Sequence, residues 1–227
     1  MKYSYFIIFF IIAVIGEVVA CVLESETINL ICKPMLLASL GGAFWIQSRD
    51  NLNSFAKLML TGFFFAWIGD TLLIFEPKHP VFFMLGLGAF LITHILYIVA
   101  FTKKGTVNSN IAQLKKKPYL ILIFAMLGLG LYTLFYPNLA DLAIPVAIYT
   151  AVIIIMVLAA INRNSITNSD SYKLCLIGAL LFMLSDMTLA VNKFFMPIDY
   201  AGLYLIVLYM AGQYLIMRGS ILHLAND

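Results

Sequence analysis

Eight stretches of about 20 predominantly apolar residues follow one another along this chain, and they constrain its fold more than any other feature. Hydrocarbon offers no hydrogen-bond partner to an open backbone, so such stretches cross a bilayer as helices. The composition agrees, because 63% of the 227 residues are hydrophobic and only 11% are charged, whereas a water-soluble domain carries about 25% charged residues. We therefore predict an all-α integral membrane protein, a single polytopic domain over residues 1–227, with eight transmembrane helices at about 3–23, 28–47, 55–75, 80–102, 118–137, 139–161, 172–192 and 198–218.

The three cysteines do not form a recognisable motif. Cys21, Cys32 and Cys175 are scattered, with no CxxC or Cys/His spacing around them. Because this spacing is missing, the sequence predicts neither a metal site nor a disulfide framework. We expect no metal and no other cofactor.

Lys and Arg are distributed unevenly between the two sides that the predicted helices define. Of the 14 Lys and Arg residues, all except Lys33, Lys78 and Lys193 fall on one side. Cytoplasmic loops carry an excess of these residues, so both termini are predicted to be cytoplasmic, in the inner membrane if the source is a bacterium. We interpret the lysines at 115–117 as a topology signal that contacts anionic lipid. No aromatic platform or soluble domain accompanies them, so nucleic-acid binding is not predicted.

Two apolar segments that each contain one aspartate match each other without a gap. Residues 57–73 read KLMLTGFFFAWIGDTLL and residues 173–189 read KLCLIGALLFMLSDMTL, with Lys, Leu, Gly and Asp shared at an offset of 116. The match indicates a duplicated four-helix unit. Its halves would be residues of about 1–104 and 117–223, joined by the polar connector 105–116.

The two matched aspartates are the feature that most needs an explanation. An even number of helices in each half makes the halves parallel, so Asp70 and Asp186 are expected at the same depth and facing each other. Each aspartate costs about 2.5–3.5 kcal/mol at the bilayer centre on insertion scales, and such residues mark function by default. The alternative is a structural role. Hydroxyl groups and a lysine would then be the hydrogen-bond partners of the aspartates, and these bonds would hold the helix bundle together.

Other polar residues are predicted in the same layer, within about 5–13 Å of the non-cytoplasmic boundary. His94 lies deeper, and a lone histidine in an apolar helix is commonly a packing residue. Lys33 could bind phosphate or simply extend toward the interface from its helix start. Glu17 could bind substrate or form a salt bridge with Lys33. The members of this layer are Glu17, Lys33, Asp70, Asp186 and Asn192.

Four short motifs, in order, resemble those of the YhhN-like lysoplasmalogenases. They are KP at 33–34, WIGDTLLIF at 67–75, LGLGAFLITHILYIVAF at 85–101 and GALLFMLSDMTLAVNKF at 178–194. The resemblance covers essentially the whole chain. It implies a membrane enzyme that hydrolyses the vinyl ether bond of lysoplasmalogens, giving a fatty aldehyde and glycerophosphoethanolamine or glycerophosphocholine. The residues that stand in these motifs are Lys33, Asp70, His94, Asp186 and Asn192, whereas Glu17 is a candidate on depth alone.

Paired carboxyl groups suit this reaction. Two close carboxyl groups in a site of low dielectric constant do not both ionise easily, so one can donate a proton while the other stays a carboxylate. We therefore expect Asp70 and Asp186 to be catalytic, with His94 orienting a carboxyl group or relaying a proton. Lys33 and Asn192, with Glu17 beside them, are expected to bind the lysophospholipid substrate.

Two other classes of membrane protein also use buried carboxyl groups. A proton-coupled transporter of lipids or small molecules fits the duplication and the aspartates. An intramembrane aspartyl protease fits less well, because Asp186 follows Ser185 and the chain has no Pro-Ala-Leu segment. Uptake without lipid hydrolysis would favour the transporter, and cleavage of a transmembrane peptide would favour the protease.

Overall fold

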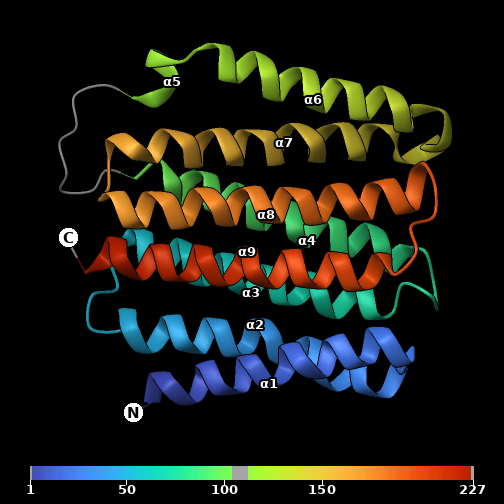
Figure 1. Cartoon of the computed structure of the whole chain (residues 1–227), viewed down its shortest axis with the longest axis horizontal. Coiled ribbons are helices and arrows are strands. Elements are labelled where there is room, and N and C mark those ends of the chain that lie inside the picture. Colours follow the sequence, from blue (N-terminus) through green and yellow to red (C-terminus); the bar gives the residue numbers. More distant parts are fainter. Residues whose placement is uncertain (1, 104–111, 226–227) are drawn as a thin grey trace. The chain divides into compact units, whose positions relative to one another are not determined.

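The computed structural model describes residues 2–103 and 112–225, and all regular secondary structure within them is helical (Figure 1). Eight helical segments of this described part are long and apolar enough to cross a membrane. The prediction of an all-α integral membrane protein with eight spans is confirmed. The predicted connector falls mostly on 104–111, outside the described residues, and its end forms the short helix α5 (Gln113–Lys116).

The chain divides into two compact units, Met1–Ala100 and Phe101–Asp227, and each is described by itself. In the first unit, successive helices run antiparallel and are joined by short turns (Figure 1). Its helices are α1 (Lys2–Leu23), α2 (Glu26–Ser48), α3 (Ser54–Ile74) and α4 (Val81–Phe101), the last of which runs one residue past the boundary.

The second unit also alternates direction from helix to helix (Figure 1). Two 3-10 turns, η1 (Tyr136–Asn138) and η2 (Ala140–Leu142), connect its first two long helices, and η3 (Arg163–Ser165) precedes the third. The long helices are α6 (Tyr119–Phe135), α7 (Ala143–Asn162), α8 (Ser169–Phe194) and α9 (Ala201–Leu224).

Side-chain caps explain where several helices begin. Asn53 accepts a hydrogen bond from the Ala56 amide at the start of α3, with an N···O distance of 2.9 Å. Asn168 does the same for the Ser171 amide at the start of α8, at 2.8 Å. Such caps satisfy amides that have no partner within the helix, and so both aspartate-bearing helices begin at a polar boundary.

The α1–α2 turn is tight and fixes the pairing of these two helices. Glu24 takes a left-handed conformation with φ of 50°, and the Ser25 amide donates back to the Ala20 carbonyl at 3.0 Å. The Ser25 hydroxyl then accepts from the Ile28 amide, so one residue ends α1 and caps α2. A side chain on Gly16 would clash with the Cys32 sulfur, which shows that these two residues lie directly opposite each other.

Glycines allow α8 and α9 to approach at backbone distance. A methyl group added at Gly178 would lie 2.7 Å from the Gly212 carbonyl oxygen, and one added at Gly212 would lie 2.9 Å from the Gly178 carbonyl oxygen. Small residues are the usual means of close helix packing in lipid, where no hydrophobic force drives helices together. In this unit they place the aspartate-bearing helix firmly against the C-terminal one.

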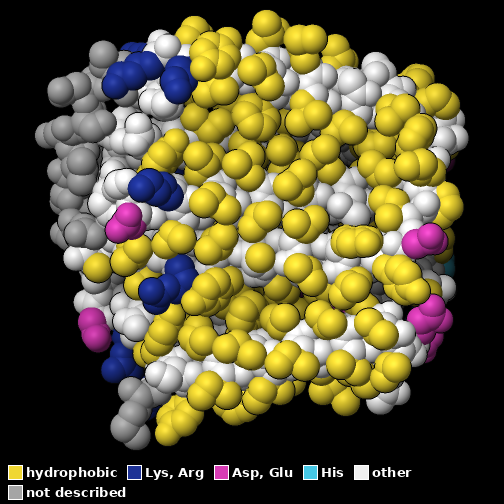
Figure 2. All heavy atoms as spheres, in the orientation of Figure 1, with side chains coloured by type: hydrophobic (Ala, Val, Ile, Leu, Met, Phe, Trp, Pro, Cys, Tyr) yellow, Lys and Arg dark blue, Asp and Glu magenta, His cyan; other side chains and the backbone are white. Residues whose placement is uncertain are grey.

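The outer surface is that of a lipid-exposed protein. Large hydrophobic side chains remain exposed along α1 and α6, for example Ile15 and Met126. Figure 2 shows hydrophobic side chains along the middle of the helices that face the viewer, with Lys and Arg gathered near their left-hand ends. In the second unit these ends carry Lys115, Lys116, Lys117, Lys173 and Arg218.

Helix ends differ from the sequence predictions by a few residues in two places. α9 continues to Leu224, whereas the prediction ended at Arg218. The extra turn buries Ser220 and His223, and a long arginine side chain can reach polar surroundings from within a helix that continues. α7 begins at Ala143, because the 3-10 turns around Pro137 occupy the residues before it. The four-helix duplication itself stays a prediction.

Candidate functional site

Asp70 is buried in the last part of α3, with 3% of its surface exposed. It lies four residues before Ile74, the last residue of the helix. At a rise of about 1.5 Å per residue, Asp70 is therefore about 6 Å from the helix end. The preceding residue is Gly69, where an added methyl group would lie 2.8 Å from the Phe90 ring of α4. α3 and α4 therefore pack closely at the residue before Asp70.

A hydrogen bond between α3 and α2 connects the Asp70 region with the KP motif. The Trp67 indole Nε1 donates to the Pro34 carbonyl oxygen at 2.9 Å. Trp67 is three residues before Asp70, so Lys33 and Pro34 lie about one helical turn from the aspartate in height. The structure thus brings Asp70 and Lys33 into the same layer of the first unit.

Glu17 lies in this layer from the side of α1. Its side chain is 1% exposed, and its Oε2 atom is completely buried without a hydrogen-bond partner. No contact ion pair joins Glu17 and Lys33 in the described part of the chain. The predicted salt bridge between Glu17 and Lys33 is therefore absent from this geometry.

His94 is completely buried in α4, at a different height from Asp70. The neighbouring Thr93 hydroxyl donates to the Gly62 carbonyl oxygen at 3.3 Å and to the Ala89 carbonyl oxygen at 3.1 Å. Phe90 lies opposite Gly69 and Tyr97 lies opposite Gly62, so the backbone of His94 is about 7–8 Å deeper than that of Asp70. The role of His94 toward the Asp70 carboxyl group stays a prediction.

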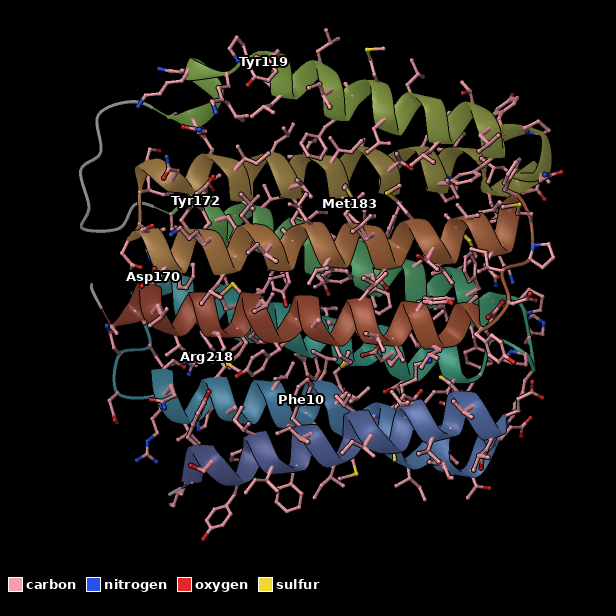
Figure 3. All side chains as sticks on the ribbon, in the orientation of Figure 1. Phe10, Tyr119, Asp170, Tyr172, Met183 and Arg218 are labelled. Carbon is pink, nitrogen blue, oxygen red and sulfur yellow. The ribbon has the colours of Figure 1, made fainter. Side chains whose placement is uncertain are left out.

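In the second unit, Asp186 has a partner that the sequence analysis did not identify. The hydroxyl of Tyr149, from α7, donates to Asp186 Oδ2 at 2.7 Å. Tyr149 is itself buried, and Asp186 is half-buried. The neighbouring Ser185 hydroxyl donates to the Leu205 carbonyl of α9 at 3.0 Å. Figure 3 labels Met183, which is one turn before Asp186, in the middle of the packed stretch of α8.

Tyr149 had a usable signal in the sequence. It follows Lys33 by 116 residues, the offset that relates Asp186 to Asp70. Tyr149, which contacts Asp186, therefore has a polar counterpart, Lys33, at the same position of the proposed first repeat. A search for such matched pairs, instead of for rare charged residues, would have found it.

Asn192 lies at the exposed end of α8 and takes part in the loop that follows. Its Oδ1 accepts a hydrogen bond from the Ile198 amide at 2.9 Å. It is six residues beyond Asp186, about 9 Å further along the helix. The structure therefore gives the Asn192 oxygen a loop-closing role and leaves its substrate contact as a proposal.

A second group of buried polar side chains lies at the opposite end of α8. Arg163, which is completely buried, donates through Nη2 to the Ser171 hydroxyl at 3.3 Å and lies 5.0 Å from the Phe101 ring centre. Thr167 and His223 are joined nearby by a 3.0 Å hydrogen bond. Figure 3 shows Asp170 and Tyr172 at this same end. Fifteen residues of helix separate Ser171 from Asp186, about 22 Å, so this group belongs to the helix ends and not to the candidate site.

The comparisons with known proteins show which family the chain belongs to. Residues 28–220 match the model of the YhhN family, and the chain is a member of that family. It is 29% identical over 170 residues to "Lysoplasmalogenase TMEM86A" of Bos taurus, covering 73% of this chain and 66% of the bovine protein. It is 29% identical over 194 residues to "Lysoplasmalogenase TMEM86B" of Homo sapiens, covering 84% of this chain and 73% of the human protein.

A porcine relative gives the same picture at slightly higher identity. "Lysoplasmalogenase TMEM86B" of Sus scrofa is 31% identical over 150 residues, which cover 66% of this chain and 57% of the porcine protein. No solved structure matches the chain. The family resemblance found in the four motifs is confirmed.

Proposed function

We propose that this protein is a membrane hydrolase that cleaves the vinyl ether bond of lysoplasmalogens. The relatives named lysoplasmalogenase support the substrate class. Within the chain, the proposal rests on the two matched aspartates. Asp70 is buried in α3, and Asp186 of α8 accepts a hydrogen bond from Tyr149 of α7. The products would be a fatty aldehyde and glycerophosphoethanolamine or glycerophosphocholine.

The proposed reaction begins with proton transfer to carbon. A protonated carboxyl group donates its proton to the alkene carbon farther from the ether oxygen, which leaves an oxocarbenium ion. The partner carboxylate stabilises this cation and removes a proton from the water that attacks it, as paired carboxyl groups do in glycosidases. The resulting hemiacetal collapses to the aldehyde and the free glycerol hydroxyl. One water molecule is consumed, and the carboxyl groups return to their starting states after a proton exchange.

The different surroundings of the two aspartates support a division of these roles. Asp186 accepts the Tyr149 hydrogen bond, which suits the carboxylate that stabilises the cation and activates water. Asp70 is buried within the apolar helix α3, which suits the proton donor to an apolar alkenyl chain. His94 enters the proposal as a proton relay deeper in α4, and Lys33 and Asn192 as contacts for phosphate or glycerol oxygens.

The test is product analysis with purified protein in detergent. Wild-type protein should release fatty aldehyde from a 1-alkenyl lysophospholipid and none from the 1-alkyl analogue, whose ether oxygen has no adjacent alkene to protonate. Absence of aldehyde from folded protein would contradict the proposal. Proton-coupled uptake into proteoliposomes in that case would support the transporter, the first of the two other classes that buried aspartates favour.

Orientation is part of the same proposal, because the candidate site lies near the α1–α2 turn and the end of α3. The excess of Lys and Arg at the opposite helix ends supports cytoplasmic termini and a site near the non-cytoplasmic face. A cysteine introduced at Lys78 should react with an impermeant thiol reagent added to the non-cytoplasmic side, and one at Arg49 only with reagent on the cytoplasmic side. The reverse labelling pattern would overturn this orientation.

A further inference from the structure

The α1–α2 hairpin contains two buried oxygen atoms whose hydrogen-bonding capacity is unused. They are Glu17 Oε2 and Asn29 Oδ1, both completely buried without a hydrogen-bond partner. A buried acceptor without a donor costs about 1–3 kcal/mol, and more when the group is charged. Native structures rarely keep such atoms unless a ligand, an ion or water satisfies them. These two atoms therefore indicate a site for a molecule that donates hydrogen bonds.

The pairing of the two helices places these oxygens close to a positive charge. Cys32 lies opposite Gly16, so Glu17, Asn29 and Lys33 differ by only about 3–6 Å in height along the hairpin. Asn29 and Lys33 are four residues apart on α2 and share one helix face. Both are half-buried, so their side chains are partly accessible from outside the unit, beside the buried carboxyl group.

The charges are separated in a way that suits a zwitterion. Lys33 and the Glu17 carboxyl group lie at similar heights of the hairpin without forming a contact ion pair with each other. A ligand with a cationic group at one end and an anionic group a few bonds away could bridge the two. The unused oxygen atoms of Glu17 and Asn29 can both accept hydrogen bonds from an organic ammonium group, which makes such a cation a fitting occupant.

We infer that Glu17, Asn29 and Lys33 bind the phosphoethanolamine headgroup of the substrate, and that Glu17 selects ethanolamine over choline. The ammonium group would donate to Glu17 and Asn29, and Lys33 would donate to a phosphate oxygen. A trimethylammonium group has no N–H to donate, so it would leave both oxygens unsatisfied. This inference rests on the proposed function for the identity of the ligand.

The position of the site relative to Asp70 agrees with one substrate reaching both. The Trp67 indole, one turn before Asp70, donates to the carbonyl of Pro34, the residue after Lys33. In a lysoplasmalogen only the glycerol backbone separates the phosphate from the vinyl ether. A phosphate at Lys33 would therefore place the reacting bond within the part of the unit that contains Asp70.

The experiment measures binding without hydrolysis, using 1-alkyl lysophosphatidylethanolamine and 1-alkyl lysophosphatidylcholine as probes. The chain has two tryptophans, so Trp45→Phe leaves Trp67, next to the site, as the single fluorescent reporter. In this background we expect the ethanolamine probe to bind about tenfold more tightly than the choline probe. Glu17→Gln should abolish most of this preference, whereas Lys33→Gln should weaken both probes by a similar factor.

Matched controls keep the outcome interpretable. Glu26→Gln changes an exposed carboxylate of the same hairpin and should leave the preference intact. Asn29→Leu, which removes the other acceptor, should lower the preference if Glu17→Gln does not fold, and Glu17→Asp should retain part of it. An unchanged ratio in Glu17→Gln, or displacement of the probe by diacyl phosphatidylethanolamine as readily as by the lysolipid, would overturn the inference. Because hydrolysis is measured separately, selective binding without aldehyde release would contradict only the proposed function.

Discussion

The aspartate-bearing helices α3 and α8 share a sequence pattern but differ in what surrounds it. In both, a glycine eight residues before the aspartate lies at a crossing with the next helix. A side chain on Gly62 would meet the Tyr97 ring, whereas one on Gly178 would meet the backbone of α9. Asp70 is buried, while Asp186 is half-buried and hydrogen-bonded to Tyr149. Equal sequence motifs thus give unequal sites, which suits two carboxyl groups with different roles.

The same offset of 116 residues relates other features of the two units. Lys33, near Asp70, corresponds to Tyr149, the partner of Asp186. Glu24 and Ala140, also 116 residues apart, both have a positive φ, 50° and 45°, after the first long helix of their unit. These matches support the proposed duplication. They also show where the units have diverged, since a cation near one aspartate is a neutral hydroxyl at the other.

Removing either carboxyl group should have the largest effect. Asp70→Asn and Asp186→Asn keep the size of the side chain but remove its acid or base function, so each should lower aldehyde release by about 10²–10⁴-fold. The measurement is the initial rate on the alkenyl lysolipid, with thermal melting in detergent to confirm folding. Full activity in one folded variant would show that only one of the units contributes a catalytic carboxyl group.

Tyr149→Phe tests whether the hydrogen bond from Tyr149 to Asp186 has a function. Loss of a hydrogen bond to a charged group should lower turnover by about tenfold or more and change the pH–rate profile. Tyr149 acts in this account as a positioning residue, so the change in the pH profile is the decisive readout. Tyr119→Phe, at an exposed position of α6, is the matched control. A lower melting temperature with an unchanged pH profile would indicate a purely structural tyrosine.

The difference in glycine surroundings predicts a difference in stability. Gly178→Ala forces a methyl group against backbone atoms of α9 and should destabilise the protein by about 1–3 kcal/mol. Gly62→Ala should cost less, because the added methyl group would meet a side chain, Tyr97, instead of backbone atoms. Gly130→Ala, where an added methyl group has nothing within 4 Å, should be neutral or stabilising by up to about 1 kcal/mol. Denaturant titrations of the three variants give the order, and equal losses for all three would contradict the packing described here.

The smallest effect is expected at the two left-handed residues. Glu24→Gly and Ala140→Gly remove the steric cost of a positive φ, and each should stabilise the protein by up to about 1 kcal/mol. Similar gains at both positions would sharpen the comparison between the units. Destabilisation at one of them would show that its turn depends on the side chain that is present, and melting temperatures are sufficient to decide.

The sequence was sufficient to predict the helices, because apolar stretches of this length have few alternatives in a bilayer. It was less informative about helix ends, as the continuation of α9 past Arg218 shows. Asp70 and Asp186 could be found because charged residues are rare in apolar spans. Tyr149 was missed, because it is one of 12 tyrosines and only its offset of 116 residues from Lys33 distinguishes it in the sequence. The loop-closing bond of Asn192 likewise depends on a turn geometry that no periodic pattern encodes.

A double-mutant cycle on Asp70 and Asp186 tests the central claim, that the two carboxyl groups serve one reaction. Aldehyde release would be compared among wild type, Asp70→Asn, Asp186→Asn and the double variant, all verified as folded. Residues that act as a unit have strongly non-additive effects, so the double variant should be about as slow as the slower single variant. If the rate loss of the double variant equals the product of the two single-variant losses, the aspartates act independently. That result would contradict the account.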